Sequence, residues 1–339
     1  MSLARLLTNS ERPLFVVGSE KNAGKTATLN RIRAEARLEG LSGFGLCTAG
    51  WDGESSDHLT GDQKPKVTVF PNDLVLTTGD LLATAQARLE LLWAGSLSGQ
   101  AGRPVIGRCI RAGEVELVGP PTVAELGEAL DRMTRLGARR VLVDGAADRK
   151  TPISAFPGAE VGLVFRPETG ESVDDFARRV AQVVMLYQLP QYESPRPSGL
   201  RGEQVALGDG KTWTFHMPVD LDEESVQNGK LHTWLGGPLT LPLLDDLQDL
   251  GVKTIIVDDP SRLVLPSNRV NRGIEKGLSF QLGMRPSVSF VAVRCDGGKR
   301  RSLPPRETLK KLSDILAPIP VLDPWSVAPP LESASGGTP

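Results

Sequence analysis

Near the start of the chain, a glycine, a lysine and a threonine stand where an apolar stretch meets a helical pattern. Residues 14–17 are apolar, and the loop after them ends in Gly24-Lys25-Thr26. Such a loop suits phosphate, because its backbone N–H groups and the positive end of the helix dipole point at phosphate oxygens. In this arrangement Lys25 reaches the β- and γ-phosphates, Thr26 ligates Mg²⁺, and Gly24 lets the backbone come close without a Cβ.

The spacing of the two glycines is one residue longer than usual. Gly18 gives G-x-x-x-x-x-G-K-T, where the common motif has four residues between the glycines. The alternative is an ordinary helix start with an exposed lysine, which a chain with 36 glycines can contain by chance. We predict that the nucleotide is bound by Gly18, Ser19, Glu20, Lys21, Asn22, Ala23, Gly24, Lys25 and Thr26.

A carboxylate at the end of a second apolar stretch is the next candidate. Residues 141–143 are apolar and are followed by Asp144 and Gly145, the form of a Walker B segment. A carboxylate in this place would hold the Mg²⁺ shell or orient an attacking water. Strand-end aspartates are frequent in any α/β sheet, so the interpretation depends on the loop at Lys25 in the same half of the chain. We predict that Lys25 and Asp144 are the catalytic residues.

Composition excludes several classes of protein. The net charge of −2 implies no general attraction to nucleic acid. The three cysteines and three histidines are scattered, which argues against a disulfide framework and against a zinc site. No run reaches 18 apolar residues, and residues 1–13 lack a long apolar core with a cleavage site, so we expect no membrane span and a cytoplasmic location.

The order of elements predicts an α/β fold. Helices and strands alternate along both halves, which favours a largely parallel sheet flanked by helices, plus a second, smaller α/β unit. With 339 residues, two domains are the expectation. We predict a nucleotide-binding domain at 1–189, a proline-rich linker at 190–201, a C-terminal α/β domain at 202–323 and a disordered tail at 324–339.

Finer expectations concern the segments between the two acidic candidates. The patterns predict a hairpin of strands 66–70 and 73–77, a helix over 79–93, and a second hairpin of strands 105–111 and 114–118.

Two further strings in the second half are expected to be turns. The string GDGKT at 208–212 looks like the end of the phosphate loop, but it lies between strands and opens no helix, so we predict a hairpin turn. Asp258-Asp259 at a strand end could face a second site, but a turn before Pro260 is the stronger expectation.

Residues 18–26 resemble the loop of dethiobiotin synthetase and of cobyrinic acid amidating synthetases. These families belong to the P-loop class that also holds MinD-type and nitrogenase-iron-protein ATPases. The class shares the longer spacing, and its Walker B analogue is a strand-end acid followed by glycine, as in Val143-Asp144-Gly145-Ala146. The resemblance covers roughly residues 12 to 165 and implies ATP and Mg²⁺.

The same resemblance implies a third acid in the loop after the second strand. Asp52, in GWDGE, takes the equivalent place, so the implied metal ligands are Thr26, Asp52 and Asp144. Glu54 and Asp57 are alternates in the same acidic loop. Asp52 could instead be a turn residue.

The chain differs from these families at several positions, and the differences reduce the number of reactions that the resemblance supports. Dethiobiotin synthetase has an acid where Asn22 stands and a Lys-Pro pair where this chain has Thr48-Ala49-Gly50, so biotin-precursor chemistry is not supported. MinD-type proteins carry a second lysine five residues before the loop lysine, whereas Lys21 precedes Lys25 by four. Lys21 is therefore either a cross-subunit lysine or, more simply, a solvated one.

Three functions follow from these readings. The first is a Mg-ATP-binding NTPase, a hydrolase that drives a partner protein. The layout of the chain also looks like that of accessory proteins of adenosylcobalamin-dependent aminomutases, and this resemblance implies such an enzyme as the partner. The alternatives are a carboxylate-activating ligase and a non-hydrolysing nucleotide-binding scaffold. The acidic loop around Asp52 favours the NTPase over the ligase. ATP is the default because the guanine-reading Asn-Lys-x-Asp motif is absent, and a homodimer is an expectation by analogy with the class.

Overall fold

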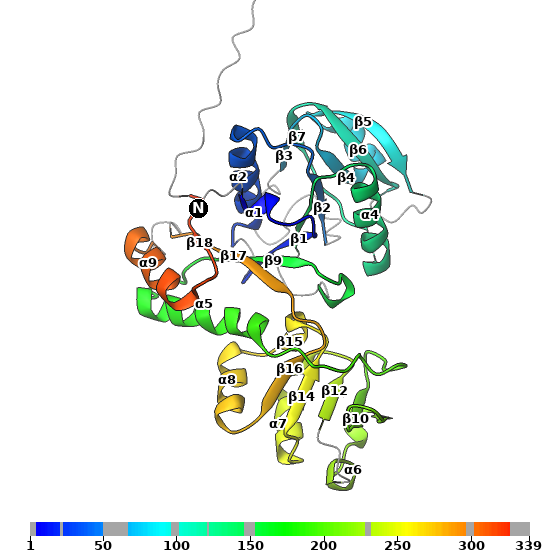
Figure 1. The fold of residues 1–339 in the computed structure, drawn as a ribbon, viewed down its shortest axis with the longest axis vertical. Helices are drawn as coiled ribbons and strands as arrows, with labels where there is room; N and C mark the ends of the chain where they lie inside the picture. The colour runs from blue at the N-terminus through cyan, green and yellow to red at the C-terminus, as the bar shows by residue number, and fades with distance from the viewer. Residues whose placement is uncertain are drawn as a thin grey trace, which may run out of the picture. The chain divides into compact units, whose positions relative to one another are not determined.

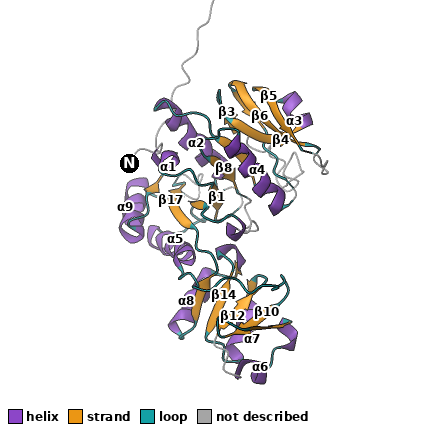
Figure 2. Ribbon diagram, turned by 45° about the vertical axis from the view of Figure 1, so that its right-hand side comes forward, coloured by secondary structure: helices purple, strands orange, loops and turns teal. Residues whose placement is uncertain are grey.

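The chain folds into two compact units, drawn in Figures 1 and 2. A computed structural model describes residues 5–20, 23–49, 67–95, 102–120, 122–145, 153–227, 232–295 and 302–325. The first unit takes the described residues within 1–148, 160–176 and 288–339, and the second those within 149–159 and 177–287. No helix in these described ranges is long and apolar enough to cross a membrane.

The first unit is built on a nine-stranded sheet. Its strands in spatial order are β18 (Val321–Leu322), β17 (Ser287–Val293), β9 (Glu160–Phe165), β1 (Leu14–Gly18), β8 (Val141–Asp144), β2 (Gly45–Thr48), β4 (Leu74–Thr78), β6 (Pro104–Arg111) and β5 (Arg88–Ala94). The pairs β9–β1, β1–β8, β8–β2, β2–β4 and β17–β18 are parallel, and only β4–β6 and β6–β5 are antiparallel among the registers defined. The prediction of an α/β fold with a large, mostly parallel sheet is confirmed.

Helices cover both faces of this sheet, which explains why its central strands are apolar throughout. All five residues of β1 are buried, as expected for a strand covered on both faces. Figure 1 shows α2 and α4 on either side of β2. The helices of the first unit are α1 (Arg5–Thr8), α2 (Lys25–Leu38), α3 (Gly79–Thr84), α4 (Val123–Arg135) and α9 (Pro305–Leu316), and α5 (Val173–Gln188) contains the boundary between the units.

The predicted helix over 79–93 is wrong in its second half. α3 ends at Thr84, and residues 88–94 form β5, the edge strand of the sheet. The sequence RLELLWA has good helix formers, but β6 offers it a partner over its whole length. Pairing and packing in the sheet override the local helix propensity.

Both predicted hairpins are also wrong, because each strand pairs elsewhere. β3 (Val67–Val69) pairs with β7 (Gly113–Val115), whereas β4 and β6 pair with each other in the large sheet. The buried carboxylate of Asp73 redirects the chain between β3 and β4. It accepts hydrogen bonds from the backbone N–H groups of Phe44 and Phe70 and forms an ion pair with buried Arg33.

The second unit contains a five-stranded sheet. Its strands in spatial order are β11 (Trp213–His216), β10 (Val205–Gly208), β12 (His232–Leu235), β14 (Thr254–Val257) and β16 (Ser279–Leu282). The last three run parallel, and β10 is antiparallel to both its neighbours. The remaining strands and helices of this unit are α6 (Glu223–Gln227), β13 (Leu239–Thr240), α7 (Leu241–Asp249), β15 (Leu263–Val264) and α8 (Ser267–Glu275).

Residues 288–322 do not belong to the C-terminal unit in which the sequence placed them. β17 and β18 extend the sheet of the first unit. Phe290 packs against Gly162 of β9, where a Cβ would collide with the ring. The glycine thus makes room for an aromatic residue that buries the returning strand.

Candidate functional site

The candidate phosphate loop lies between β1 and α2 at the carboxyl edge of the large sheet. β1 ends at Gly18, and α2 begins at Lys25. Gly24 has φ 103°, in the left-handed region that favours glycine. The neighbouring parallel strand β8 ends at Asp144, which pairs in register with Val16. The loop and the acid therefore meet at one edge of the sheet.

Thr26 and Asp144 are joined directly. The Thr26 hydroxyl donates a hydrogen bond of 2.6 Å to Oδ2 of Asp144, across 118 positions of sequence. The other carboxyl oxygen, Oδ1, is buried and has no hydrogen-bond partner among the described residues. A buried oxygen without a partner is costly, and a bound ion is one group that would satisfy it. The pair presents a hydroxyl and a carboxylate oxygen, the donor types that Mg²⁺ prefers.

Burial raises the pKa of Asp144 above its ordinary value. The hydrogen bond from Thr26 and the positive charge of Lys25 act in the opposite direction but do not cancel the burial. Taking the carboxylate out of water disfavours its charged form. A cation beside Oδ1 would favour the charged form, so the acid is suited to metal binding.

The loop is anchored to the neighbouring strand β9. The N–H of Ser19 donates to the carbonyl of Val164 at 2.9 Å, and Glu20 forms a two-pronged ion pair with Arg166, at 2.7 and 3.3 Å. The Ser19 hydroxyl oxygen is buried and unpartnered within the described ranges. Arg166 immediately follows β9. Arg166 was not among the residues predicted from the sequence. Its position directly after a parallel strand is the signal that could have identified it, because such positions lie at the carboxyl edge of the sheet.

An aromatic side chain from the end of β18 lies against the loop. The ring of Trp325 approaches Gly24 so closely that a Cβ there would stand 2.6 Å from Cζ2. The guanidinium carbon of Arg294, which follows β17, lies 5.6 Å from the centre of the same ring. Neither residue was predicted, because the sequence does not reveal that β17 and β18 join this sheet.

Several predicted site residues lie outside the described ranges. Lys21 and Asn22 of the loop are among them, as are Asp52 and its alternates Glu54 and Asp57. Within the described ranges, no group of three or more His, Cys, Asp or Glu side chains could hold a metal. Within the described ranges, the candidate metal ligands are therefore Thr26 and Asp144.

Two neighbours on β2 support Asp144. The hydroxyl of Thr48 donates to the backbone carbonyl of Asp144 at 2.9 Å. Cys47 is fully buried, and burial, with a smaller contribution from Asp144, raises the pKa of its thiol. The thiol is therefore neutral and acts as a packing residue.

The predicted turns in the second unit have structural roles. In GDGKT, the carboxylate of Asp209 accepts hydrogen bonds from Thr212 and Lys211, which closes the β10–β11 hairpin as predicted. The Asp259 carboxylate accepts hydrogen bonds from the N–H groups of Ser261 and Ser154, which fixes the turn at Pro260. Asp258 accepts from the Trp234 indole N–H and from Arg196.

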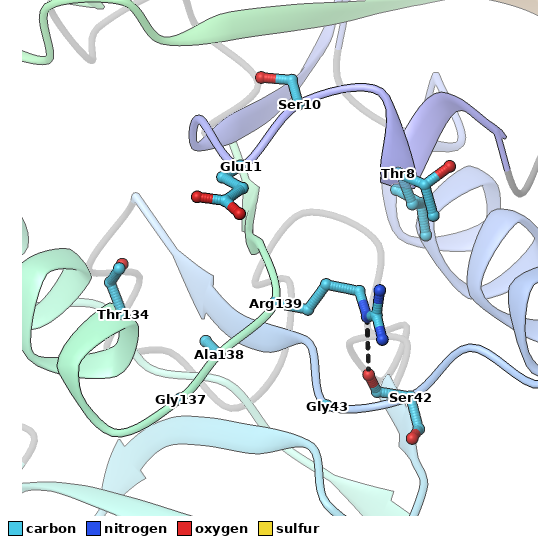
Figure 3. Close-up of a pocket in the computed structure, with 10 residues that line it drawn as sticks. Thr8, Ser10, Glu11, Ser42, Gly43, Thr134, Gly137, Ala138 and Arg139 are labelled. Atoms are coloured by element: carbon cyan, nitrogen blue, oxygen red, sulfur yellow. Dashed lines mark hydrogen bonds between the residues drawn. The ribbon is translucent and has the colours of Figure 1, made fainter.

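A cavity of about 480 Å³ opens at the other edge of the large sheet (Figure 3). It lies before the starts of β1, β2 and β8, and Arg139 donates to the Ser42 carbonyl at its wall. None of Gly24, Thr26 and Asp144 lines it. Its lining residues are Leu7, Thr8, Ser10, Glu11, Ser42, Gly43, Thr134, Gly137, Ala138 and Arg139.

No protein-family model, curated protein or solved structure matches the chain.

Proposed function

We propose that the protein binds a magnesium–nucleoside triphosphate, with ATP as the expected nucleotide, and hydrolyses it. The hydrogen bond between Thr26 and Asp144 carries this proposal. It joins the residue that follows the loop lysine to an acid at the end of the adjacent parallel strand. One hydroxyl and one carboxylate beside a lysine and a helix N-terminus form the minimal set for phosphoryl transfer.

The positively charged groups of the site and its oxygen donors have different proposed roles. The N–H groups at the start of α2 and the ammonium of Lys25 would bind the phosphate oxygens, since each supplies positive charge where the nucleotide is negative. Thr26 and Asp144 would hold Mg²⁺, and their oxygen donors fit that ion. When bound, Mg²⁺ neutralises charge on the β- and γ-phosphates. Burial raises the pKa of Asp144, and a cation beside the carboxylate would favour its charged form.

We extend the proposal to a nucleotide cycle that acts on a partner protein, such as a cofactor-dependent enzyme. Chain connectivity supports it, because the chain passes between the two units several times, including after Ala159, Phe176 and Ser287. The segment from 160 to 176 carries Arg166, which is paired with Glu20 of the loop. This ion pair thus links the loop to the segment that leads into the second unit.

The test is a calorimetric titration of ATP and GTP with Mg²⁺, with phosphate release measured in parallel. Lys25→Ala should weaken nucleotide binding at least tenfold and abolish release, because the phosphates lose their cation. The matched control is Lys211→Ala, which removes the lysine of the second Gly-Lys-Thr string without touching the site. Equal effects of the two substitutions on nucleotide affinity and on phosphate release would refute the proposal.

A further inference from the structure

The bare side of Gly24 is covered by an indole ring. In a phosphate-binding loop, the glycine before the lysine lets the backbone approach the phosphate because no Cβ stands between them. A group that stands where the Cβ would be therefore occupies the space that the glycine leaves open for a close ligand. At Gly24 that position lies 2.6 Å from Cζ2 and 2.8 Å from Cη2 of Trp325. The ring and a close phosphate would compete for the same space.

The ring is held in place by several contacts of the first unit. The backbone N–H of Trp325 donates to the Asp323 carboxylate at 2.9 Å, which fixes the turn after β18. The guanidinium of Arg294 lies against the ring, and the ring packs against the core cluster that contains Ala23 and Leu29. Trp325 is nevertheless only partly buried. A partly exposed ring on a short turn can leave Gly24 without disturbing the sheet.

We infer that Trp325 is an internal competitor of the nucleotide, which must displace the ring from Gly24 in order to bind. The inference rests on the proposed function, since it assigns the loop to phosphate. The ring would lower the affinity of the loop for the nucleotide. The apparent affinity equals the intrinsic affinity multiplied by the fraction of molecules in which the ring does not cover Gly24. A factor that held the ring away from Gly24 would raise that affinity.

The experiment uses tripolyphosphate with Mg²⁺, a probe that has no base or ribose. Its affinity is measured by calorimetry for the unmodified protein, Trp325→Ala and Trp325→Phe. The control is Trp93→Ala, because Trp93 also lies under an arginine, with Arg132 4.8 Å from its ring centre, but at the opposite edge of the same sheet. ATP is titrated in the same way. Trp325→Phe serves if the alanine variant does not fold.

A ring that covers Gly24 nine-tenths of the time lowers the apparent affinity about tenfold. We therefore expect Trp325→Ala to bind tripolyphosphate and ATP about tenfold more tightly, Trp325→Phe to lie between, and Trp93→Ala to be unchanged. The strongest support would be tight binding of tripolyphosphate and ATP by Trp325→Ala when the other proteins do not bind them tightly.

Unchanged tripolyphosphate affinity in both Trp325 variants would overturn the inference and leave the proposed function standing. Weaker ATP binding with unchanged tripolyphosphate binding would overturn it too, since the indole would then be a platform for the base. If no variant, including the one without the ring, binds either probe, the proposed function itself fails.

Discussion

Asp144 accepts a hydrogen bond from Thr26 through one carboxyl oxygen and leaves the other buried and unpartnered. This geometry has opposite effects on stability and on binding. The buried, unpartnered oxygen lowers the stability of the fold, and the same oxygen can bind a cation. The site residues are therefore not those that a fold optimised for stability alone would select.

Replacing Asp144 with asparagine should stabilise the protein and remove its response to Mg²⁺. The folded pKa of Asp144 is raised, so ionisation disfavours the folded state. The penalty is absent below the ordinary aspartate pKa, grows as the pH rises towards the raised folded value, and is complete above it. At pH 8 we expect Asp144→Asn to be more stable by about 1 kcal/mol or more, because the amide carries no charge to be taken out of water.

The measurement is chemical denaturation of both proteins from pH 4 to pH 8, with and without Mg²⁺ and nucleotide. The stability difference should widen with pH and should shrink when Mg²⁺ and nucleotide are added. A difference that is independent of pH would show that the carboxyl group is not responsible.

The ion pair between Glu20 and Arg166 should matter for binding more than for stability. Its side chains are 36% and 20% exposed, so the pair itself contributes at most about 1 kcal/mol to folding. Arg166→Ala leaves the carboxylate of Glu20 uncompensated within the loop, where it repels phosphate. We expect ATP affinity to fall about tenfold, in line with one uncompensated charge near a surface.

Calorimetry on the two single variants and the double variant tests this coupling. Adding Glu20→Ala to Arg166→Ala should restore most of the affinity, because the repelling charge is gone. Arg269→Ala breaks an exposed pair with Asp245 in the second unit and serves as the control. Additive losses in the double variant would contradict the electrostatic role.

Gly162 should tolerate no side chain while Phe290 is opposite. A Cβ at Gly162 would collide with the ring, so Gly162→Ala should destabilise the protein by about 1 to 3 kcal/mol through overpacking. Adding Phe290→Leu should recover part of that loss. Gly202→Ala is the control, since nothing lies within 4 Å of a Cβ there. Equal melting temperatures for Gly162→Ala and Gly202→Ala would contradict the packing of β17 on β9.

Local sequence patterns predicted the strand and the helix on either side of the loop. They did not predict which strands pair with each other, because that depends on residues distant in sequence. The bounds of α2 and the strand before Asp144 follow from apolar runs and glycine punctuation, signals within one element. The strand β5 and the partners of β3 and β7 depend on neighbours distant in sequence. A pattern read along the chain contains no information about these neighbours.

The candidate site divides in the same way. Gly24, Lys25, Thr26 and Asp144 were predictable because their types and spacing relate to phosphate chemistry directly. Trp325 escaped prediction because its role depends on β18 returning to the first sheet. The roles of Gly24, Lys25, Thr26 and Asp144 stay predictions, as do those of Lys21, Asn22 and Asp52, which lie outside the described ranges.

The dependence of ATP affinity on Mg²⁺, compared between the unmodified protein and Thr26→Val, tests the central claim most directly. Valine keeps the shape of threonine but removes the hydroxyl that meets Asp144. We expect Mg²⁺ to strengthen ATP binding at least tenfold in the unmodified protein and in Thr212→Val, the control in the second Gly-Lys-Thr string. In Thr26→Val that enhancement should disappear while the Mg²⁺-free affinity stays. An equal Mg²⁺ enhancement in all three proteins would contradict the assignment of Thr26 and Asp144 as the metal site.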